Sequence, residues 1–218
     1  MPSPIYVFDA YGTLFDVHAA IRRFASGPDA ERMSEIWRGK QLEYSWTLTL
    51  AGHYEEFWTL TERALDYALE RVPVVDKTLK PKLMNAYYSL DAFPDARTTL
   101  KALKARGART GILSNGSPAM LKGAVDAAKL GGELDEVLSV DAVKMFKPRM
   151  EVYRLVTDAF KCRRAEVVFV SSNRWDIMGA TTFGFRCAWV NRAKLLPEYG
   201  ANCTTIPDLA ALPDLVLN

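Results

Sequence analysis

The sequence is short of histidine, of cysteine and of net charge. Its 218 residues include two histidines and three cysteines, and the formal net charge is +2. Such a small charge gives no reason to expect nucleic acid or a membrane surface as a partner. The cysteines have no CxxC spacing and cannot all pair internally, so we expect reduced thiols in a cytoplasmic protein.

Long apolar runs are missing as well. No apolar stretch approaches the roughly 20 residues that a membrane-spanning helix needs. The amino terminus lacks a charged region followed by a long apolar one, so no secretory signal is expected. With 49% hydrophobic and 25% charged residues, the composition is that of an ordinary globular protein. The length suits one large domain or a core with a smaller insert.

The most informative segment is a short apolar run that ends in a carboxylate. Residues 5–8, Ile-Tyr-Val-Phe, predict a buried strand, and residues 10–13 break the pattern as a turn. Asp9 therefore lies at the carboxyl end of a buried strand. Open α/β sheets bind their ligands at this edge.

After residue 16 the pattern changes from strand to helix. Helices are predicted near residues 29–50, 53–71 and 76–89, in a region rich in aromatic residues. The first of them carries a broader apolar surface than one face of a helix needs. We therefore expect it to cover something, such as the carboxyl edge of a sheet.

From residue 93 onward helix and strand patterns alternate, which is typical of a parallel sheet with helices on both faces. The predicted strands are 109–113, 137–139, 167–170 and 186–190, and the predicted helices are 95–106, 118 onward, 149–160, 174–182 and a short one within 207–217. Gly107 and Pro118 suit the end and the start of their helices. We expect an α/β protein with a Rossmann-like parallel-sheet core domain, residues 1–14 and 92–218, and an inserted all-helical cap domain, residues 15–91.

Polar side chains gather where the predicted strands end. Taken singly, each has an ordinary explanation as a turn residue, a helix cap or a solvated lysine. Because the carboxyl ends of parallel strands meet at one edge, their joint placement favours a shared site. The residues are Asp9, Ser114, Asn115, Ser172 and Asn173, with Lys147 in the loop before a following helix.

Together these segments resemble the haloacid dehalogenase superfamily. The resemblance rests on residues 8–17, 113–118, 147–148 and 171–176, and extends from residue 5 to about residue 191. Residues 37–44, Trp-Arg-Gly-Lys-Gln-Leu-Glu-Tyr, are similar to the L-2-haloacid dehalogenase branch in particular. The resemblance implies a homodimer that hydrolyses short-chain L-2-haloacids to D-2-hydroxy acids without a metal or other cofactor.

The resemblance also implies a role for each residue of the expected site. Asp9 would attack C2 of the substrate and form an ester, with Lys147 keeping it ionised. Arg38 and Asn115 would hold the halide, and Ser114 the substrate carboxylate. Thr13 and Ser171 would orient Asp9. Water would be activated by Asn173 and Asp176 together with Lys147, with Tyr153 beside them. The apolar pocket would be formed by Tyr11, Leu42, Phe57 and Trp175.

Several of these residues have a plain alternative role. Leu42 and Phe57 suit core packing nearly as well as a substrate pocket, and Arg38 alone would suit a solvated helix face. His18 follows the nucleophile loop but falls in no strand-end motif, so we expect no catalytic role for it. The base for water is left open among Asp176, Asn173 and Lys147.

Two rival functions follow from departures from the wider superfamily. Its phosphatases place a second aspartate, the general acid, where this chain has Tyr11, and an aspartate near residue 172 for Mg²⁺. With only Asp176 left as an acid there, a phosphatase on a small phosphate ester would hold its metal weakly. A non-catalytic binding domain is the second rival, and it leaves Arg38 and Asn115 unexplained. Gly39 and Arg174 depart from the dehalogenase branch and affect the expected substrate range, and the sequence does not show which halogen is preferred.

Overall fold

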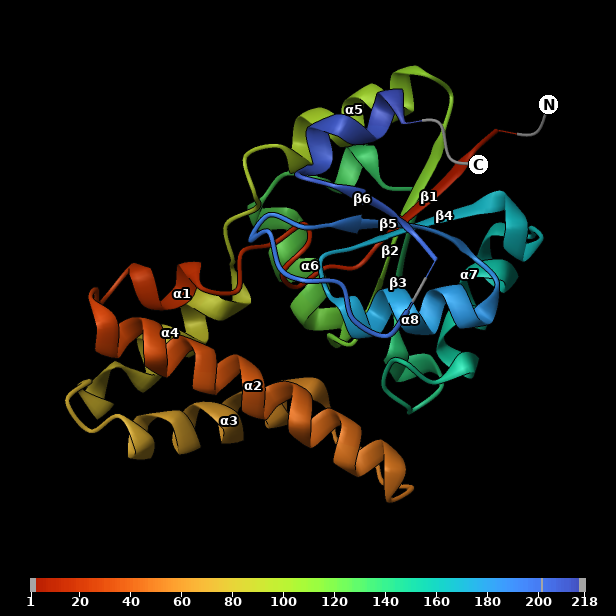
Figure 1. Ribbon diagram of the computed structural model, residues 1–218. Coiled ribbons are helices and arrows are strands. Elements are labelled where there is room, and N and C mark those ends of the chain that lie inside the picture. The colour runs from red at the N-terminus through yellow and green to blue at the C-terminus, as the bar shows by residue number, and fades with distance from the viewer. Residues whose placement is uncertain (1–2, 201, 216–218) are drawn as a thin grey trace.

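A computed structural model describes residues 3–200 and 202–215. Six strands form one sheet in the order β3-β2-β1-β4-β5-β6, and every neighbouring pair is parallel (Figure 1). The strands are β1 (Ile5–Phe8), β2 (Arg109–Ser114), β3 (Glu136–Ser139), β4 (Val167–Ser171), β5 (Arg186–Val190) and β6 (Thr204–Ile206). The prediction of a Rossmann-like α/β core is confirmed.

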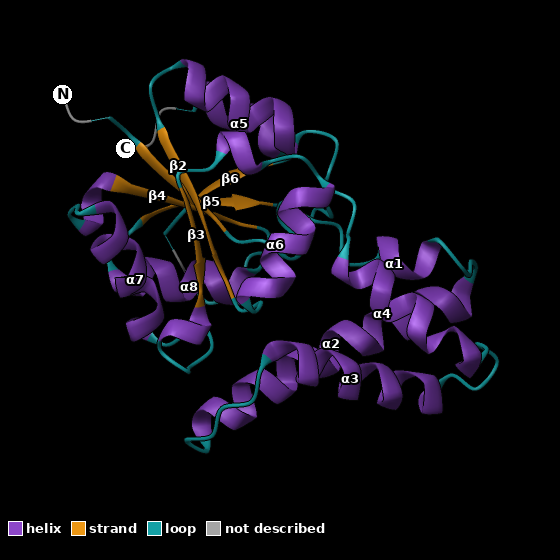
Figure 2. Cartoon of the chain, turned by 180° about the vertical axis from the view of Figure 1, so that it is seen from behind, coloured by secondary structure: helices purple, strands orange, loops and turns teal. Residues whose placement is uncertain are grey.

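Helices cover both faces of this sheet. Helix α5 (Ala96–Ala105) and a 3₁₀ helix, residues 209–214, lie on one face, and α7 (Met150–Phe160) and α8 (Arg174–Phe183) on the other (Figure 2). Helix α6 (Pro118–Ala127) packs against β3. Since both faces are covered, the central strand β4 is buried at every position, as its continuous apolar run predicts.

The remaining α-helices form a separate helical unit, residues 19–88, beside the carboxyl ends of the strands (Figure 1). Its members are α1 (Ala19–Arg22), α2 (Pro28–Leu50), α3 (Phe57–Arg71) and α4 (Lys80–Tyr88). The chain crosses between sheet and helical unit twice, and the two crossings hydrogen-bond to each other. The backbone N–H of Asp16 donates to the Asp91 carbonyl at 2.9 Å, and that of Phe93 to the Leu14 carbonyl at 2.8 Å.

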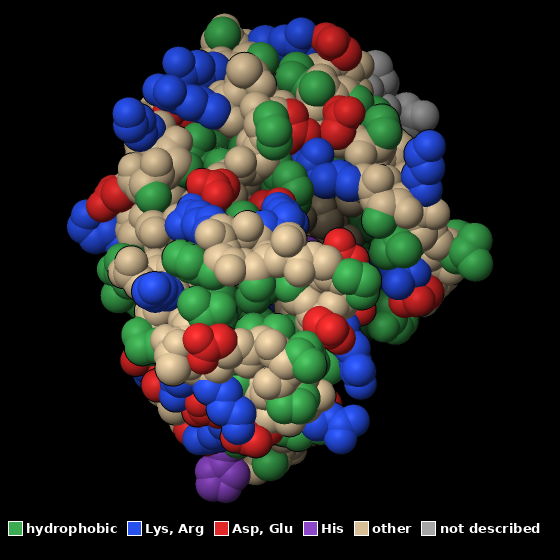
Figure 3. Space-filling model, turned by 90° about the vertical axis from the view of Figure 1, so that its left-hand side faces the viewer, with side chains coloured by type: hydrophobic (Ala, Val, Ile, Leu, Met, Phe, Trp, Pro, Cys, Tyr) green, Lys and Arg blue, Asp and Glu red, His purple; other side chains and the backbone are tan. Residues whose placement is uncertain are grey.

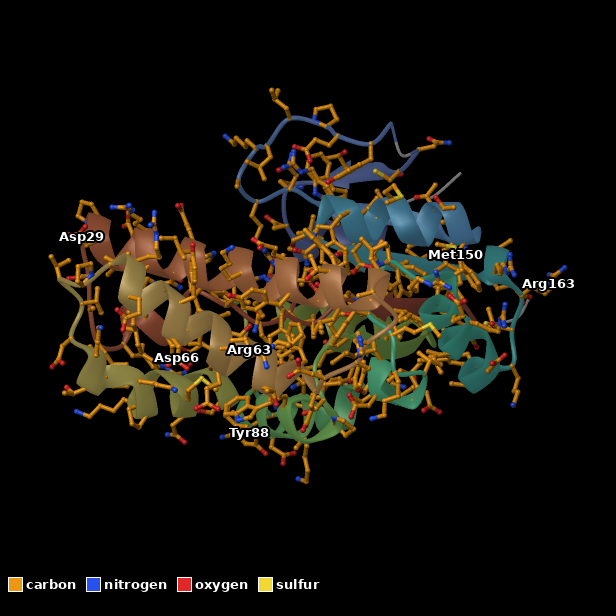
Figure 4. The ribbon with its side chains drawn as sticks, turned by 90° about the horizontal axis from the view of Figure 1, so that it is seen from below. Asp29, Arg63, Asp66, Tyr88, Met150 and Arg163 are labelled. Carbon is orange, nitrogen blue, oxygen red and sulfur yellow. The ribbon has the colours of Figure 1, made fainter. Side chains whose placement is uncertain are left out.

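The broad apolar surface of α2 has two partners, because this helix packs on α3 and also reaches the sheet domain. Figure 4 shows it running from Asp29, at the outer end of the helical unit, towards the side where Met150 begins α7. Near its far end, Thr49 Oγ1 accepts a hydrogen bond from the Phe146 backbone at 3.2 Å. The helical unit is therefore tied to the sheet domain both at the crossings and at the end of α2.

The differences from the predicted elements are small and local. Strand β6 was not predicted, because three residues are too few to show an alternating pattern. The tail forms a 3₁₀ helix over residues 209–214, and residues 216 and 217 of that prediction lie outside the described ranges. Gly107 has a positive φ of 77° just after α5, which confirms its predicted place. Within the described ranges no helix is long and apolar enough to cross a membrane.

A substitution at Gly111 of β2 tests how closely the sheet is packed against its neighbours. A Cβ there would lie 2.8 Å from Phe160 Cζ and 3.0 Å from the Glu136 backbone oxygen on β3. We expect Gly111→Ala to lower the free energy of unfolding by about 1–3 kcal/mol, because this extra carbon overfills a packed region. Urea unfolding followed by circular dichroism measures it. Gly132→Ala is the control, since a Cβ there meets nothing within 4 Å, and equal stability of the two variants would contradict the expectation.

Candidate active site

Asp9 lies at the carboxyl end of β1 and is almost completely buried, with 4% of its surface exposed. Three side-chain donors hold its carboxylate. Lys147 Nζ lies 3.0 Å from Oδ1, while Thr13 Oγ1 and Asn173 Nδ2 donate to Oδ2 at 2.9 and 2.8 Å. The carboxylate is thus fixed in one orientation by groups from three parts of the chain.

The turn after Asp9 has the geometry that its sequence suggests. Gly12 adopts a positive φ of 96°, which favours glycine, and its neighbour Thr13 is fully buried. Thr13 Oγ1 accepts a hydrogen bond from the Ser172 backbone N–H at 2.8 Å while it donates to Asp9. The ends of β1 and β4 are therefore joined through one hydroxyl.

Lys147 bridges two buried carboxylates. Its ammonium lies 3.0 Å from Asp9 Oδ1 and 2.8 Å from Asp176 Oδ2, and its side chain is wholly inaccessible. Tyr153 donates to Asp176 Oδ1 at 2.7 Å. Ser171 Oγ donates to Asp176 at 3.3 Å and accepts from the Asn173 backbone at 3.1 Å. Ser171 thus contacts Asp176 and Asn173, and not Asp9 as the sequence suggested.

The charges of this cluster shift one another. Burial on its own lowers the pKa of Lys147, but the two carboxylates outweigh it and hold that pKa above its ordinary value, so the lysine stays charged. Burial raises the pKa of Asp176 to about 6, although the Lys147 ammonium and the Tyr153 hydroxyl act to lower it. Burial also raises the pKa of Tyr153 well above its usual range, so its hydroxyl remains a donor. With all groups ionised, the cluster carries one negative charge in excess.

Strand β2 contributes the next pair of polar residues. Ser114 is fully buried and its Oγ accepts from the Gly116 backbone at 3.1 Å. Asn115 Oδ1 accepts from the Lys147 backbone N–H at 3.0 Å. Its Nδ2 is buried and has no partner among the described residues. A buried donor without a partner costs free energy, so Asn115 has an N–H left for a further acceptor.

Arg38 reaches the site from the helical unit. It lies on α2, and its guanidinium donates to the Tyr11 carbonyl at 3.1 Å and to Gln41 Oε1 at 2.8 Å. Asn173 Nδ2 donates to the same Tyr11 carbonyl at 3.2 Å. Since a guanidinium has five N–H groups, Arg38 keeps donors for a further acceptor.

Aromatic side chains surround these polar groups. The Tyr11 ring is buried and lies parallel to that of Tyr87, with centroids 5.6 Å apart, and Phe57 packs 6.3 Å from it. Trp175 lies on α8 beside Asp176, makes an edge contact with Trp46 at 5.4 Å, and lines an apolar cavity of about 330 Å³ with Trp46 and Met178. Leu42 is half-buried on α2, one turn after Arg38.

A second cavity, of about 390 Å³, lies between the sheet domain and the helical unit. Gly12 and Asn173, which flank Asp9, line it together with Arg22, Arg38 and Arg192. Figure 3 shows a hollow on this side of the molecule with Lys or Arg side chains at its rim. An anionic substrate would meet more positive than negative side chains here.

The sheet edge does not suit a divalent cation. In residues 3–200 and 202–215 no group of three or more His, Cys, Asp or Glu is arranged to hold a metal ion. Asp9 and Asp176 both accept hydrogen bonds from the Lys147 ammonium, and the nearby Ser172 and Asn173 carry no negative charge. Mg²⁺ prefers anionic oxygen ligands, so these residues do not fit it.

The structure also places the residues whose role the sequence left open. His18 Nδ1 lies 2.7 Å from Ser34 Oγ, and His18 also lines the 390 Å³ cavity with Gly12 and Asn173. Gly39 is exposed, and Arg174 pairs with Glu198 at 2.9 Å. Sequence reasoning missed Gln41, which contacts Arg38. Its one signal was the spacing of three residues after Arg38, which puts both on one side of a helix.

Known proteins resemble this chain over nearly its whole length. The family described as haloacid dehalogenase-like hydrolase matches residues 4–184. (S)-2-haloacid dehalogenase 1 of Pseudomonas sp. (strain CBS-3) is 49% identical over 216 residues, which cover 97% of this chain and 95% of that protein. A solved structure of a dehalogenase with an intermediate complex has a TM-score of 0.95 at 45% identity, covering 99% of this chain and 98% of that one.

A second solved structure is that of L-2-haloacid dehalogenase from Xanthobacter autotrophicus with chloropropionic acid covalently bound. It has a TM-score of 0.86 at 36% identity and covers 97% of both chains. These likenesses extend over both the sheet domain and the helical unit. The chain belongs to the haloacid dehalogenase-like hydrolases and, within them, to the L-2-haloacid dehalogenase branch.

Proposed function

We propose that this protein hydrolyses short-chain L-2-haloacids to D-2-hydroxy acids through an ester on Asp9, without a metal or other cofactor. The observation that carries the proposal is a buried carboxylate held at a strand end by three donors, Lys147, Thr13 and Asn173. The (S)-2-haloacid dehalogenases to which the chain is similar support the substrate class.

In the first step a carboxylate oxygen of Asp9 attacks C2 of the substrate, and the carbon–halogen bond breaks with its electron pair leaving on the halide. Attack from the side opposite the halogen inverts C2. Arg38 and the unpartnered Nδ2 of Asn115 hold the departing halide. Ser114 and nearby backbone N–H groups hold the substrate carboxylate.

The apolar side chains around the site serve this step. A carboxylate is a weak nucleophile in water, and a closed apolar surround lessens its solvation. Tyr11 and Phe57 are buried, while Leu42 and Trp175 are half-buried on α2 and α8. Together they form the pocket for the short alkyl group of the substrate.

In the second step a water attacks the Asp9 carbonyl carbon, the bond to the substrate oxygen breaks, and the hydroxy acid leaves. Asp176 takes the proton of this water. Its pKa of about 6 makes it largely ionised at neutral pH yet basic enough to accept a proton. Asn173 and Lys147 position the water and the ester, and Tyr153 and Ser171 hold Asp176.

The two rival functions are less well supported. A magnesium phosphatase needs an acid where this chain has Tyr11, whose ring is buried against Tyr87. A non-catalytic binding domain has no use for a buried lysine between Asp9 and Asp176, which is costly to build.

Three wider expectations belong to the same proposal. Residues 15–91 act as a cap domain over the core of residues 1–14 and 92–218, and the hydrogen-bonded crossings near residues 15 and 92 support these boundaries. The protein is a homodimer in the cytoplasm, as the family resemblance implies. It has no nucleic-acid or membrane partner.

The first test is halide release from L- and D-2-chloropropionate in the presence of EDTA. We expect halide from the L form alone, at a rate that EDTA does not change, because Lys147 and Arg38 supply the positive charge. Hydrolysis of an aryl phosphate with Mg²⁺ is assayed in parallel. Phosphate release without any halide release would replace the dehalogenase with the phosphatase.

Asp9→Asn tests the nucleophile. We expect it to abolish halide release, because a neutral amide does not displace halide from carbon. Peptide mass spectrometry checks that the amide has not hydrolysed back to aspartate. Asp76→Asn is the control, since Asp76 is an exposed helix cap remote from the site. Full activity in a verified Asp9→Asn protein would remove Asp9 from the mechanism.

The pKa of Asp176 predicts a pH dependence. As the pH falls through about 6, Asp176 becomes protonated and can no longer accept a proton, so hydrolysis of the ester should slow. Asp176→Asn should accumulate the ester on Asp9, which mass spectrometry of quenched samples detects. Tyr153→Phe removes a hydrogen bond to the Asp176 carboxylate and should move this acid limb to higher pH. If the acid limb of the pH–rate profile lies at the same pH in Tyr153→Phe as in the wild type, the limb belongs to a group other than Asp176.

A further inference from the structure

Gln41 is a fully buried polar side chain that lies behind Arg38 on α2. None of its surface is exposed. Burying an amide is costly unless its polar atoms find partners. Here Oε1 accepts hydrogen bonds from Arg38 Nη1 at 2.8 Å and from the Tyr87 hydroxyl at 3.0 Å, and Nε2 donates to Thr61 Oγ1 at 2.6 Å. Gln41 therefore connects Arg38 to α3 and α4.

The partners of Gln41 are themselves fixed. Thr61 Oγ1 donates to the Phe57 carbonyl at 2.7 Å, and the Thr61 carbonyl accepts from Trp37 Nε1 at 2.8 Å. The Tyr87 ring packs on Trp37 at 5.1 Å. A side chain held from three helices has little freedom to move, so the Arg38 guanidinium is held by a rigid acceptor.

The type of acceptor matters as much as its position. Within residues 3–200 and 202–215, Arg38 forms no ion pair with a carboxylate, whereas Arg22 and Arg192 pair with Asp16 and Asp95. The amide of Gln41 orients the guanidinium without cancelling its charge. A carboxylate in the same place would form a buried ion pair and weaken the attraction of Arg38 for another anion.

We propose that Gln41 is a positioning residue for halide departure, which aims Arg38 and keeps its charge uncompensated. The inference rests on the proposed function, in which Arg38 holds the leaving halide. It adds a residue that touches neither substrate nor halide and yet sets how strongly the site stabilises the leaving group. Gln41→Glu and Gln41→Met separate the two parts of this role, charge and orientation.

The experiment compares single-turnover halide release from L-2-chloropropionate and L-2-bromopropionate. Bromide leaves more readily than chloride, so it depends less on Arg38. We expect Gln41→Glu to slow chloride release about tenfold or more, since charge-assisted hydrogen bonds contribute roughly that factor. Bromide release should slow less, so the bromide-to-chloride rate ratio rises. Gln41→Met should raise the ratio by a smaller factor, because the charge remains.

Ser45→Ala is the matched control. Ser45 is also fully buried on α2, but its hydroxyl donates to the Leu42 carbonyl of the same helix. We expect the rate ratio of this variant to equal that of the wild type. Circular dichroism melting confirms that each variant is folded, and a merely structural role would lower both rates by the same factor.

A double-mutant cycle with Arg38→Lys tests whether Gln41 acts through Arg38. In that background the paired contact is already lost, so Gln41→Met should change the ratio by less than about twofold. Two results would overturn the inference: an unchanged bromide-to-chloride rate ratio in folded Gln41→Glu, or an equal effect of Gln41→Met in the wild-type and Arg38→Lys backgrounds. Halide release by the wild type would still support the proposed function. No halide release from the wild type would overturn both.

Discussion

The site is organised around one buried ammonium. Lys147 Nζ lies within 3.0 Å of both Asp9 and Asp176, and none of its side chain reaches solvent. Removing charges from water costs several kcal/mol for each ion unless the geometry and further hydrogen bonds offset it. Further hydrogen bonds are made accordingly, to Asp9 by Thr13 and Asn173 and to Asp176 chiefly by Tyr153, and Asp9 Oδ1 keeps a lone pair beside its bond to Lys147. The hydrogen bonds that stabilise this buried charge cluster thus also hold the Asp9 carboxylate in one orientation.

The excess negative charge of this cluster explains why the sheet domain alone is insufficient. An anionic substrate would be repelled by it, so further positive charge must come from elsewhere. Arg38 supplies that charge from α2, and α2 must therefore be held against the sheet. The hydrogen-bonded crossings near residues 15 and 92 tie the helical unit to the sheet domain, and the contact of Thr49 with Phe146 holds the far end of α2. In the proposed function, the helical unit thus has an electrostatic role as well as an apolar covering role.

Much of this arrangement was predictable because it depends on strand ends. The apolar runs before Asp9, Ser114 and Ser171 predict buried parallel strands, and parallel strands necessarily bring their carboxyl ends to one edge. The role of Gln41 was not predictable in this way. Glutamine in a helix is usually exposed, and its burial depends on how α2, α3 and α4 pack, which no local pattern encodes. Strand β6 could not be predicted for a different reason, since three residues show no periodicity.

Position 11 connects the fold to the choice of reaction. Tyr11 contributes an apolar ring, buried beside Tyr87, and a carbonyl that accepts from both Arg38 and Asn173. Burial raises its pKa well above the ordinary value, so it stays neutral. A phosphate ester releases an alkoxide, which needs a proton from a general acid at this point. A halide is the anion of a strong acid and leaves without a proton, so its departure requires only hydrogen-bond donors and positive charge. Replacing an acid by a buried tyrosine therefore removes nothing that carbon–halogen cleavage needs, and it adds the apolar wall that this reaction does need.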